Sequence, residues 1–375
     1  MLKCNKKNCT GCGACNYVCP FGAIKMTKDK NGFLYPDVDR NKCKNCDICN
    51  KTCPALTKKY DDNEIFSYIV QLKNKDDLMR SASGGAFYGL AKQVINCGGV
   101  VFGVSNYNMN LKYLCVDKVE DLYKLQGSKY CQCNITKDDF ELINKFSKER
   151  LVLVSGTPCQ MSAIKNISKI NKKNIFTVEI LCQGVPSQTV IDKYNSFKEK
   201  KEKKKIINHY YRSKDKYVGR NYLNKYVFED NTIKYYVGEE DELSLSFQRQ
   251  IFLRESCYKC KYANEKRVSD FVIGDLWNKE IIPSKINAEK GVSFIICTNE
   301  NSNNIFGENI YFNKVKTNLN NIVHDNIPFH HPVKKPFARF YSYNVLNLSN
   351  NPILTTKLSC YKYYLKKIIR SEKNK

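Results

Sequence analysis

Short apolar runs alternate with segments of helical spacing between residues 65 and 297 of the chain. Runs of this length that are rich in Val, Ile and Phe predict buried β-strands. They cover residues 65–72, 100–104, 151–154, 175–181, 271–273 and 292–297. Alternation of this kind predicts an α/β domain.

The pattern changes toward both ends of the chain. Residues 1–57 are turn-rich and dense in cysteine, which predicts a separate small domain before a main domain at 64–340. Residues 341–375 form a basic tail that is predicted to be helical. The spacing in 354–375 is that of a basic amphipathic helix, for which packing on the main domain is favoured over docking on an acidic partner or a membrane surface.

Composition narrows the class of protein. The chain has 375 residues, of which 42% are apolar, as in a globular protein of more than one domain. The N-terminus lacks an apolar signal region, and no apolar run approaches the roughly 20 residues that span a bilayer. We therefore expect a cytoplasmic protein without a transmembrane segment. The formal charge of +25 indicates either an acidic protein or anionic substrate as partner or a surface that is merely solvated, and no nucleic acid is expected because Lys is spread along the whole chain.

The 19 cysteines predict metal clusters, because cytosolic thiols stay reduced and the spacings are those of metal ligands. The stretch CTGCGACNYVCP (9–20) is repeated as CKNCDICNKTCP (43–54). This is the bacterial ferredoxin signature, in which the fourth cysteine ligates the other cluster. The predicted 4Fe-4S ligands are Cys9, Cys12, Cys15 and Cys53 for one cluster, and Cys43, Cys46, Cys49 and Cys19 for the other. A pair of zinc sites is the alternative, but this dense spacing suits a cube better than a tetrahedral ion.

Four further cysteines lie in the α/β region, within SGTPCQ, LCQGVPS and CYKC. The first two follow predicted strands, so they are expected at the carboxyl edge of the sheet, where ligands of open α/β folds bind. The last two form a chelating pair on a loop. Together they are candidate ligands of a third 4Fe-4S cluster: Cys159, Cys182, Cys257 and Cys260. The alternative is that they are isolated small hydrophobic residues of the core.

Five ordered segments resemble one protein family. They are SASGGAFYGLAKQVINCGGVVFGV (81–104), LQGSKYCQC (125–133), LVLVSGTPCQMSAIK (151–165), LCQGVPS (181–187) and CYKCKYANEKRVSDFVIGDLW (257–277). The chain is similar, from about residue 1 to residue 331, to the coenzyme F420 hydrogenase/dehydrogenase beta-subunit family, here fused to an N-terminal dicluster ferredoxin. The resemblance implies the third cluster and a bound flavin, FAD rather than FMN. The predicted fold is an α+β ferredoxin-like dicluster domain followed by an α/β flavin-binding domain.

The resemblance also assigns residues to the flavin pocket. They come from three loops: Ser83, Gly84 and Gly85; Gly127, Ser128, Lys129 and Tyr130; and Gly156, Thr157 and Pro158. Independently of the family, a Gly-Gly pair that opens a helix can present backbone N–H groups to a phosphate. Lys129 can neutralise a pyrophosphate or a reduced flavin, and Tyr130 can supply a proton. Lys129 and Tyr130 are therefore the candidate catalytic residues.

Other residues near these motifs have more than one interpretation. Asp270 and Asp275 bracket a predicted strand, where a structural and a catalytic role are equally expected. Cys131 and Cys133 lie beside the predicted flavin loop, and packing is favoured over a redox role. The chain has four histidines, His209, His324, His330 and His331, and the last two lie in the segment PFHHPVKKPFARF. A proton donor is expected from this segment or from Tyr130, although a satisfied hydrogen-bonding role is favoured for each histidine.

The function that this resemblance implies is that of an iron–sulfur flavoprotein oxidoreductase. We expect a reduced ferredoxin or a similar acidic carrier to supply single electrons. A flavin would pass two of them to a small-molecule or glycan-linked substrate, F420-type or other. The alternatives are a non-catalytic electron-transfer subunit that serves a partner enzyme and an iron–sulfur redox sensor. Exposed clusters suit an anaerobe, and a homo-oligomer is compatible with the sequence.

Overall fold

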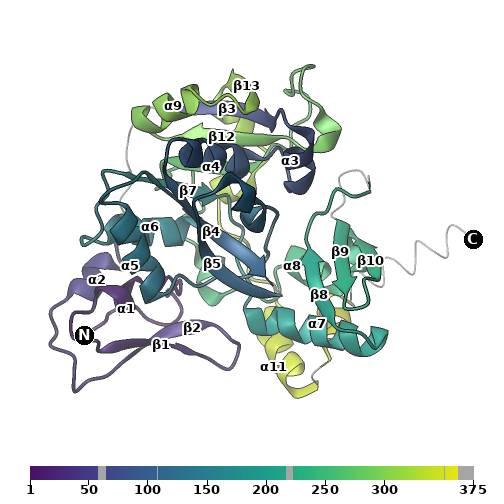
Figure 1. Ribbon diagram of the computed structural model, residues 1–375. Helices are drawn as coiled ribbons and strands as arrows, with labels where there is room; N and C mark the ends of the chain where they lie inside the picture. The colour runs from purple at the N-terminus through teal and green to yellow at the C-terminus, as the bar shows by residue number, and fades with distance from the viewer. Residues whose placement is uncertain (58–64, 108, 217–222, 350, 362–375) are drawn as a thin grey trace, which may run out of the picture.

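The computed structural model describes residues 1–57, 65–107, 109–216, 223–349 and 351–361. Within these ranges the strands form one sheet of eight, one of three and one of two strands. Figure 1 shows the small N-terminal domain, in purple, beside the large central sheet, with the three-stranded sheet on the other side. The mixed α/β fold is thereby confirmed, whereas the predicted boundary at 58–64 lies outside the described residues.

The N-terminal domain is a hairpin flanked by two short helices. Strand β1 (Ile24–Lys28) pairs antiparallel with β2 (Leu34–Val38). Helices α1 (Ala14–Val18) and α2 (Ile48–Thr52) lie at equivalent places in the two cysteine repeats and pack on each other. The ring of Tyr17 on α1 stacks on Phe140 of the main domain, with 5.2 Å between ring centroids. This contact is part of the packing between the cysteine-rich domain and the main domain.

The central sheet has the strand order β13-β3-β12-β11-β7-β6-β4-β5. Its strands are β3 (Phe66–Leu72), β4 (Val100–Tyr107), β5 (Asn110–Val116), β6 (Val152–Gly156), β7 (Ile175–Ile180), β11 (Phe271–Asp275), β12 (Ser293–Cys297) and β13 (Phe312–Thr317). Strands β4, β6, β7 and β11 are mutually parallel, and the remaining pairings are antiparallel. All six predicted strands are present. The parallel strands therefore end at one edge of the sheet, where sequence analysis places Cys159 and Cys182.

Helices cover both faces of this sheet, which explains why its central strands are apolar on both sides. Helix α4 (Ala86–Asn96) packs on the face that carries Val101 and Leu153. Helices α5 (Lys137–Phe146) and α6 (Pro158–Asn166) pack on the opposite face. Further helices of this domain are α3 (Lys75–Arg80), η1 (Val119–Leu125), η3 (Glu255–Lys259), η4 (Ala288–Lys290), α9 (Glu300–Gly307), α10 (Leu319–Val323) and η5 (Ile327–Phe329).

A second lobe combines the chain between β7 and β11 with two helices that follow β13. Its antiparallel sheet contains β8 (Ile206–Tyr210), β9 (Leu223–Phe228) and β10 (Ile233–Val237). Its helices are α7 (Gln188–Glu202), η2 (Gly238–Glu240), α8 (Glu242–Gln248), α11 (Arg339–Ser349) and α12 (Pro352–Ser359). Within the predicted tail the structure describes α11 and α12, and residues 350 and 362–375 lie outside the described ranges. No helix that the structure describes is long and apolar enough to cross a membrane.

Candidate functional site

Four cysteines of the N-terminal domain surround one small cavity of about 20 Å³. They are Cys19, Cys43, Cys46 and Cys49. Cys19 comes from the first repeat and the other three from the second, so the structure brings together the crosswise set that the ferredoxin spacing predicts. The backbone N–H of Ala23 donates to Cys19 Sγ over 3.4 Å. This donor suits an electron-rich sulfur ligand of an iron–sulfur cluster.

The other crosswise set also gathers in the structure: Cys9, Cys12, Cys15 and Cys53. Gly11 (φ 69°) and Gly13 (φ 80°) adopt the left-handed backbone that this loop requires. The N–H groups of Gly11 and Ala14 donate to the sulfurs of Cys9 and Cys12, and those of Ala55 and Leu56 donate to Cys53. A loop with N–H groups turned toward sulfur fits a cluster with four thiolate ligands.

Sequence analysis missed a ninth thiol in this domain, Cys4. It forms side-chain hydrogen bonds with Cys53 and Cys9, which raise its own pKa. The pKa of Cys9 is lowered to about 6, first by the Cys4 hydrogen bond and then, against the effect of burial, by the nearby Arg254. Cys4 precedes the repeated motif at a C-x4-C spacing, which is not a ferredoxin signature, so the sequence offered little signal for it.

The four cysteines of the main domain meet at the carboxyl edge of its parallel strands. Cys159 is the second residue of α6, directly after β6, and Cys182 lies two residues beyond β7. Cys257 and Cys260 lie within and just after η3. The pKa of Cys182 is raised well above its usual value, first by burial and then by the charges of the other three thiols. The four sulfurs therefore lie near one another.

Backbone N–H groups point at this second group of sulfurs as well. Gly184 donates to Cys182, Val185 donates to Cys257, and Tyr262 and Ala263 donate to Cys260. The donor set again fits a 4Fe-4S cluster. No group of three or more His, Cys, Asp or Glu side chains among the described residues is arranged to hold a single metal ion.

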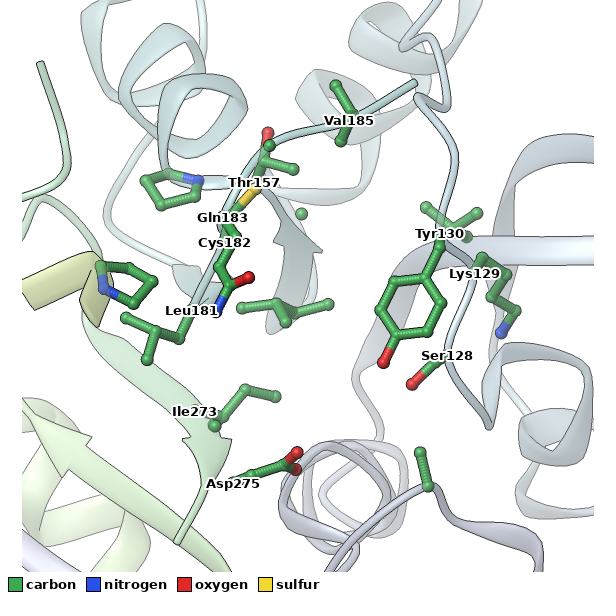
Figure 2. Close-up of a pocket in the computed structure, with 18 of the residues that line it drawn as sticks. Ser128, Lys129, Tyr130, Thr157, Leu181, Cys182, Gln183, Val185, Ile273 and Asp275 are labelled. Carbon is green, nitrogen blue, oxygen red and sulfur yellow. The ribbon is translucent and has the colours of Figure 1, made fainter. Parts of the chain in front are cut away.

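A cavity of about 430 Å³ opens beside these four cysteines. All but one of the residues that the family resemblance assigns to a flavin line it, namely Ser83, Gly85, Gly127, Ser128, Lys129, Tyr130, Gly156, Thr157 and Pro158. Figure 2 shows Ser128 and Tyr130 on one side of the cavity and Leu181, Cys182 and Ile273 on the other. At Gly127 no heavy atom lies within 4 Å of the place that a Cβ would occupy, so this loop faces open space. An apolar cavity with backbone and hydroxyl groups at its rim is typical of cofactor sites.

Of the Gly-Gly pair, Gly85 lines the cavity and Gly84 does not. The N–H of Gly84 donates to Ser293 Oγ over 2.9 Å, and a Cβ at this position would lie 2.4 Å from the backbone nitrogen of Ser293. The absence of a side chain therefore serves close packing against β12. Gly85, with φ 80° at the start of α4, keeps its place in the wall of the cavity.

Lys129 lines the cavity and is held there by backbone carbonyls. Its ammonium group donates to the carbonyls of Leu125 (2.8 Å) and Gln126 (2.7 Å), at the end of η1. Burial lowers the pKa of Lys129 to about 7, so it is not a permanent cation. Lys214, which sequence analysis missed, donates to the carbonyls of Leu78 (2.9 Å) and Ser83 (2.6 Å). Burial and the charge of Arg212 lower its pKa to about 7 as well.

A polar cluster stands at one side of the cavity around Tyr130. Arg212 pairs with Asp275 at 2.5 Å, and both side chains are mostly buried. Tyr130 forms side-chain hydrogen bonds with Ser128 and Arg212, although burial still raises its pKa. Asp275 thus belongs to the cavity. Sequence analysis missed Arg212, because nothing in its local sequence links it to the flavin motifs.

Asp270, the other predicted carboxylate, has a structural position. It accepts hydrogen bonds from the Thr177 backbone (2.8 Å) and hydroxyl (2.7 Å) and from Lys165 (3.2 Å). These bonds tie β11 to β7 and α6. The two aspartates that bracket β11 therefore differ: Asp270 joins elements of the sheet, and Asp275 faces the cavity.

The histidines separate by position. His331 lines the cavity, whereas His324 is exposed beside Asp325. His209 is stacked on Tyr226, and burial lowers its pKa to about 4. His330 contacts the Val323 carbonyl at 3.0 Å. Only His331 among the four therefore lines the cavity from which a proton would be delivered.

Cys131 and Cys133 are buried in the cavity wall. Burial raises the pKa of both thiols, to about 12 for Cys133. Protonated, buried thiols of this kind are consistent with the packing role that sequence analysis favours.

Two family models match separate parts of the chain. Residues 149–318 match the family model for the C terminus of the coenzyme F420 hydrogenase/dehydrogenase beta subunit, and residues 8–56 match the model "4Fe-4S dicluster domain". The chain is 28% identical over 186 residues to the F subunit of F(420)H(2) dehydrogenase from Methanosarcina mazei. That alignment covers 46% of this chain and 53% of the relative, so the chain spans about half the length of the curated relative that it matches.

The fold was also compared with solved structures. The F420-reducing NiFe hydrogenase complex from Methanosarcina barkeri, solved as a xenon derivative, contains a chain that aligns with a TM-score of 0.46 and 15% identity. The alignment covers 69% of this chain and 85% of that one.

Proposed function

We propose that the chain is an iron–sulfur flavoprotein oxidoreductase, because residues 149–318 match the C terminus of the coenzyme F420 hydrogenase/dehydrogenase beta subunit and residues 8–56 match a 4Fe-4S dicluster domain. Single electrons enter from a ferredoxin-like donor, pass through the clusters to FAD in the cavity, and leave in pairs to a small-molecule or glycan-linked acceptor. The formal charge of +25 supports an acidic donor, because opposite charge speeds productive encounters.

One observation carries this proposal: the cysteines of the third predicted cluster and the predicted flavin loops line the same cavity. A flavin supplies the conversion between one-electron and two-electron chemistry when it is bound. Gly127 leaves room for a planar ring or a phosphate beside the backbone, because nothing lies within 4 Å of the place that its Cβ would occupy. Ser128, Tyr130 and Arg212 would orient the ring and its substrate, and Tyr130 would hold the proton that accompanies the electrons.

The test is the cofactor content and the reducibility of the anaerobically purified protein. We expect about twelve irons and one flavin per chain, and bleaching of the flavin absorbance on addition of reduced ferredoxin. Iron, acid-labile sulfide and extracted flavin measure the first, and anaerobic absorbance spectra the second. About eight irons without flavin, even after incubation with FAD, would contradict the proposal and leave a ferredoxin-like carrier.

A second candidate is a non-catalytic electron-transfer subunit. It is favoured by the relative from Methanosarcina mazei, which is one subunit of F(420)H(2) dehydrogenase. The two candidates differ in what the reduced flavin does. A catalytic protein reoxidises its flavin when coenzyme F420 or a quinone is added alone, whereas an electron-transfer subunit stays reduced until a partner enzyme is added.

FAD binding should depend on pH through Lys214, which donates to the Ser83 carbonyl in the predicted flavin loop. Because its pKa is lowered to about 7, mainly by burial, Lys214 is mostly charged at pH 6 and mostly neutral at pH 8. If the FAD phosphates raise this pKa by about one, linkage makes binding about fivefold tighter at pH 6 than at pH 8. Fluorescence titration of the flavin-depleted protein measures this ratio.

The matched variant for that titration is Lys214→Met, which should bind FAD with the same affinity at pH 6 and pH 8 if Lys214 is the titrating group. Lys129→Met reports the contribution of the other buried lysine, whose pKa is also lowered to about 7 by burial. A pH dependence that persists unchanged in Lys214→Met would assign the effect elsewhere.

A further inference from the structure

Arg254 is a buried cation that lies between two of the three cysteine groups. These are the Cys9 group of the N-terminal domain (Cys9, Cys12, Cys15 and Cys53) and the Cys159 group of the main domain (Cys159, Cys182, Cys257 and Cys260). The side chain of Arg254 is 1% exposed, and this residue belongs to the loop that precedes Cys257 in the main domain. The guanidinium reaches into the N-terminal domain, where Nε donates to the Cys9 carbonyl (2.7 Å) and Nη2 to the Leu34 carbonyl (2.7 Å). Nη2 also lies 3.8 Å from Cys9 Sγ. The positive charge of Arg254 therefore lies next to Cys9 of the Cys9 group.

No carboxylate of the described residues forms an ion pair with Arg254. Nη1 donates to Gln132 Oε1 (3.0 Å), and the guanidinium lies over the rings of Tyr35 (4.3 Å) and Phe33 (5.3 Å). A buried cation without an anionic partner costs several kcal/mol, so such a residue is expected to face a negative charge. A 4Fe-4S cluster with four thiolate ligands carries a charge of about −2 and would supply it.

The backbone of Arg254 is hydrogen-bonded to the loops that carry Cys182 and Cys257 of the Cys159 group. Its N–H donates to the Val185 carbonyl and its carbonyl accepts from the Cys257 N–H, each over 2.9 Å. Val185 in turn donates its N–H to the sulfur of Cys257. One residue thus connects the loops of two predicted clusters, with its backbone in one and its guanidinium against the other.

The Cys9 group and the Cys159 group lie close to each other near Arg254. Thr10, which lies between Cys9 and Cys12 in the ferredoxin loop, lines the same cavity as Cys159 of the main domain. Gly11 leaves the space that Arg254 fills, because a Cβ at Gly11 would lie 2.6 Å from Nη1. The loop of the first cysteine repeat therefore packs closely against the guanidinium of Arg254.

We propose that Arg254 is a positioning residue that joins the Cys9 cluster to the Cys159 cysteine group and stabilises the reduced form of the Cys9 cluster. Reduction adds one negative charge beside a fixed guanidinium, which remains cationic at physiological pH. The transfer that Arg254 serves moves one electron from the first cluster to the next, with no bond formed or broken and no proton moved. That transfer rests on the proposed function, whereas the effect on the Cys9 cluster requires only the 4Fe-4S domain.

The test is a redox titration of the holoprotein followed by electron paramagnetic resonance. Arg254→Gln is expected to disfavour reduction of one N-terminal cluster about tenfold, a shift of about 59 mV to more negative potential, while the other N-terminal cluster is unchanged. Arg249→Gln is the matched control, because it removes the same charge from a more exposed arginine that pairs with Glu239. It should leave both potentials unchanged.

Gln132→Glu is a second variant that tests the same charge effect if Arg254→Gln does not fold. It places a carboxylate where Nη1 now donates to an amide, so it offsets the charge of Arg254 at nearly constant volume. The potential of the same cluster should again become more negative. Unshifted potentials in folded, iron-replete variants would overturn the proposal. A normal shift in a protein that binds no flavin would instead retain the role of Arg254 and refute the proposed oxidoreductase.

Discussion

Replacement of Cys159 by serine is expected to remove one cluster and to isolate the cavity from the N-terminal domain. Iron should fall from about twelve to about eight atoms per chain, because one of the four thiolates at the sheet edge is lost. Reduced ferredoxin should still reduce the N-terminal clusters, but bleaching of the flavin should fall to the rate without ferredoxin. Iron analysis and stopped-flow absorbance measure the two effects.

The physical reason lies in where Cys159 stands. It lines the cavity together with Thr10, which lies between Cys9 and Cys12 in the N-terminal domain, so it lies between the N-terminal cysteines and the cavity. Serine retains the helix start of α6, because Thr157 still caps that helix and Pro158 occupies its first position. The loss should therefore be confined to the cluster.

Cys115→Ser is the control for loss of a thiol in general. Cys115 is partly buried on β5, and it does not line the cavity. It should keep about twelve irons and normal flavin reduction. An unchanged iron content in Cys159→Ser would show that the four cysteines of the main domain do not hold a cluster. Loss of iron and flavin together with loss of secondary structure would point to a misfolded variant, and Cys260→Ser would then replace it.

Much of the fold was predictable because its central strands are buried on both faces. A strand such as β6, with every residue buried, is an uninterrupted apolar run in the sequence. The edge strand β13 is buried mainly at its first residue and carries Lys314 and Lys316, so its sequence resembles a loop. Strand β10 of the three-stranded sheet was missed for a similar reason, since it mixes Lys and Tyr and is mostly half-buried.

The candidate site was predictable where its chemistry is local in sequence. Cysteine spacing identifies the crosswise sets, because a cluster needs several ligands from one short loop. Arg212 and Arg254 had no such signal, since each reaches its partners from a distant segment of the chain. The Gly-Gly pair shows the converse problem: two adjacent glycines look alike in sequence, yet one faces the cavity and the other packs on Ser293.

Replacement of Tyr130 by phenylalanine should separate substrate chemistry from electron supply. The variant should keep its iron, its flavin and its rate of reduction by ferredoxin, because only a hydroxyl group at the cavity wall is lost. Reoxidation of the reduced flavin by coenzyme F420 or a quinone should slow about 100-fold, the lower range for loss of a general acid. Rapid mixing of the reduced protein with each acceptor measures that rate.

The structural basis of this prediction is the polar cluster around Tyr130. Its hydroxyl is hydrogen-bonded to Ser128 and Arg212, and Arg212 is fixed by Asp275 at 2.5 Å, so the hydroxyl is held in place beside the cavity. Tyr211→Phe is the matched control, because the Tyr211 ring packs against Tyr130 with 5.4 Å between centroids but does not line the cavity. Equal slowing in both variants would assign the effect to packing. Unchanged reoxidation in Tyr130→Phe would transfer the proton-donor role to His331, the histidine that lines the same cavity.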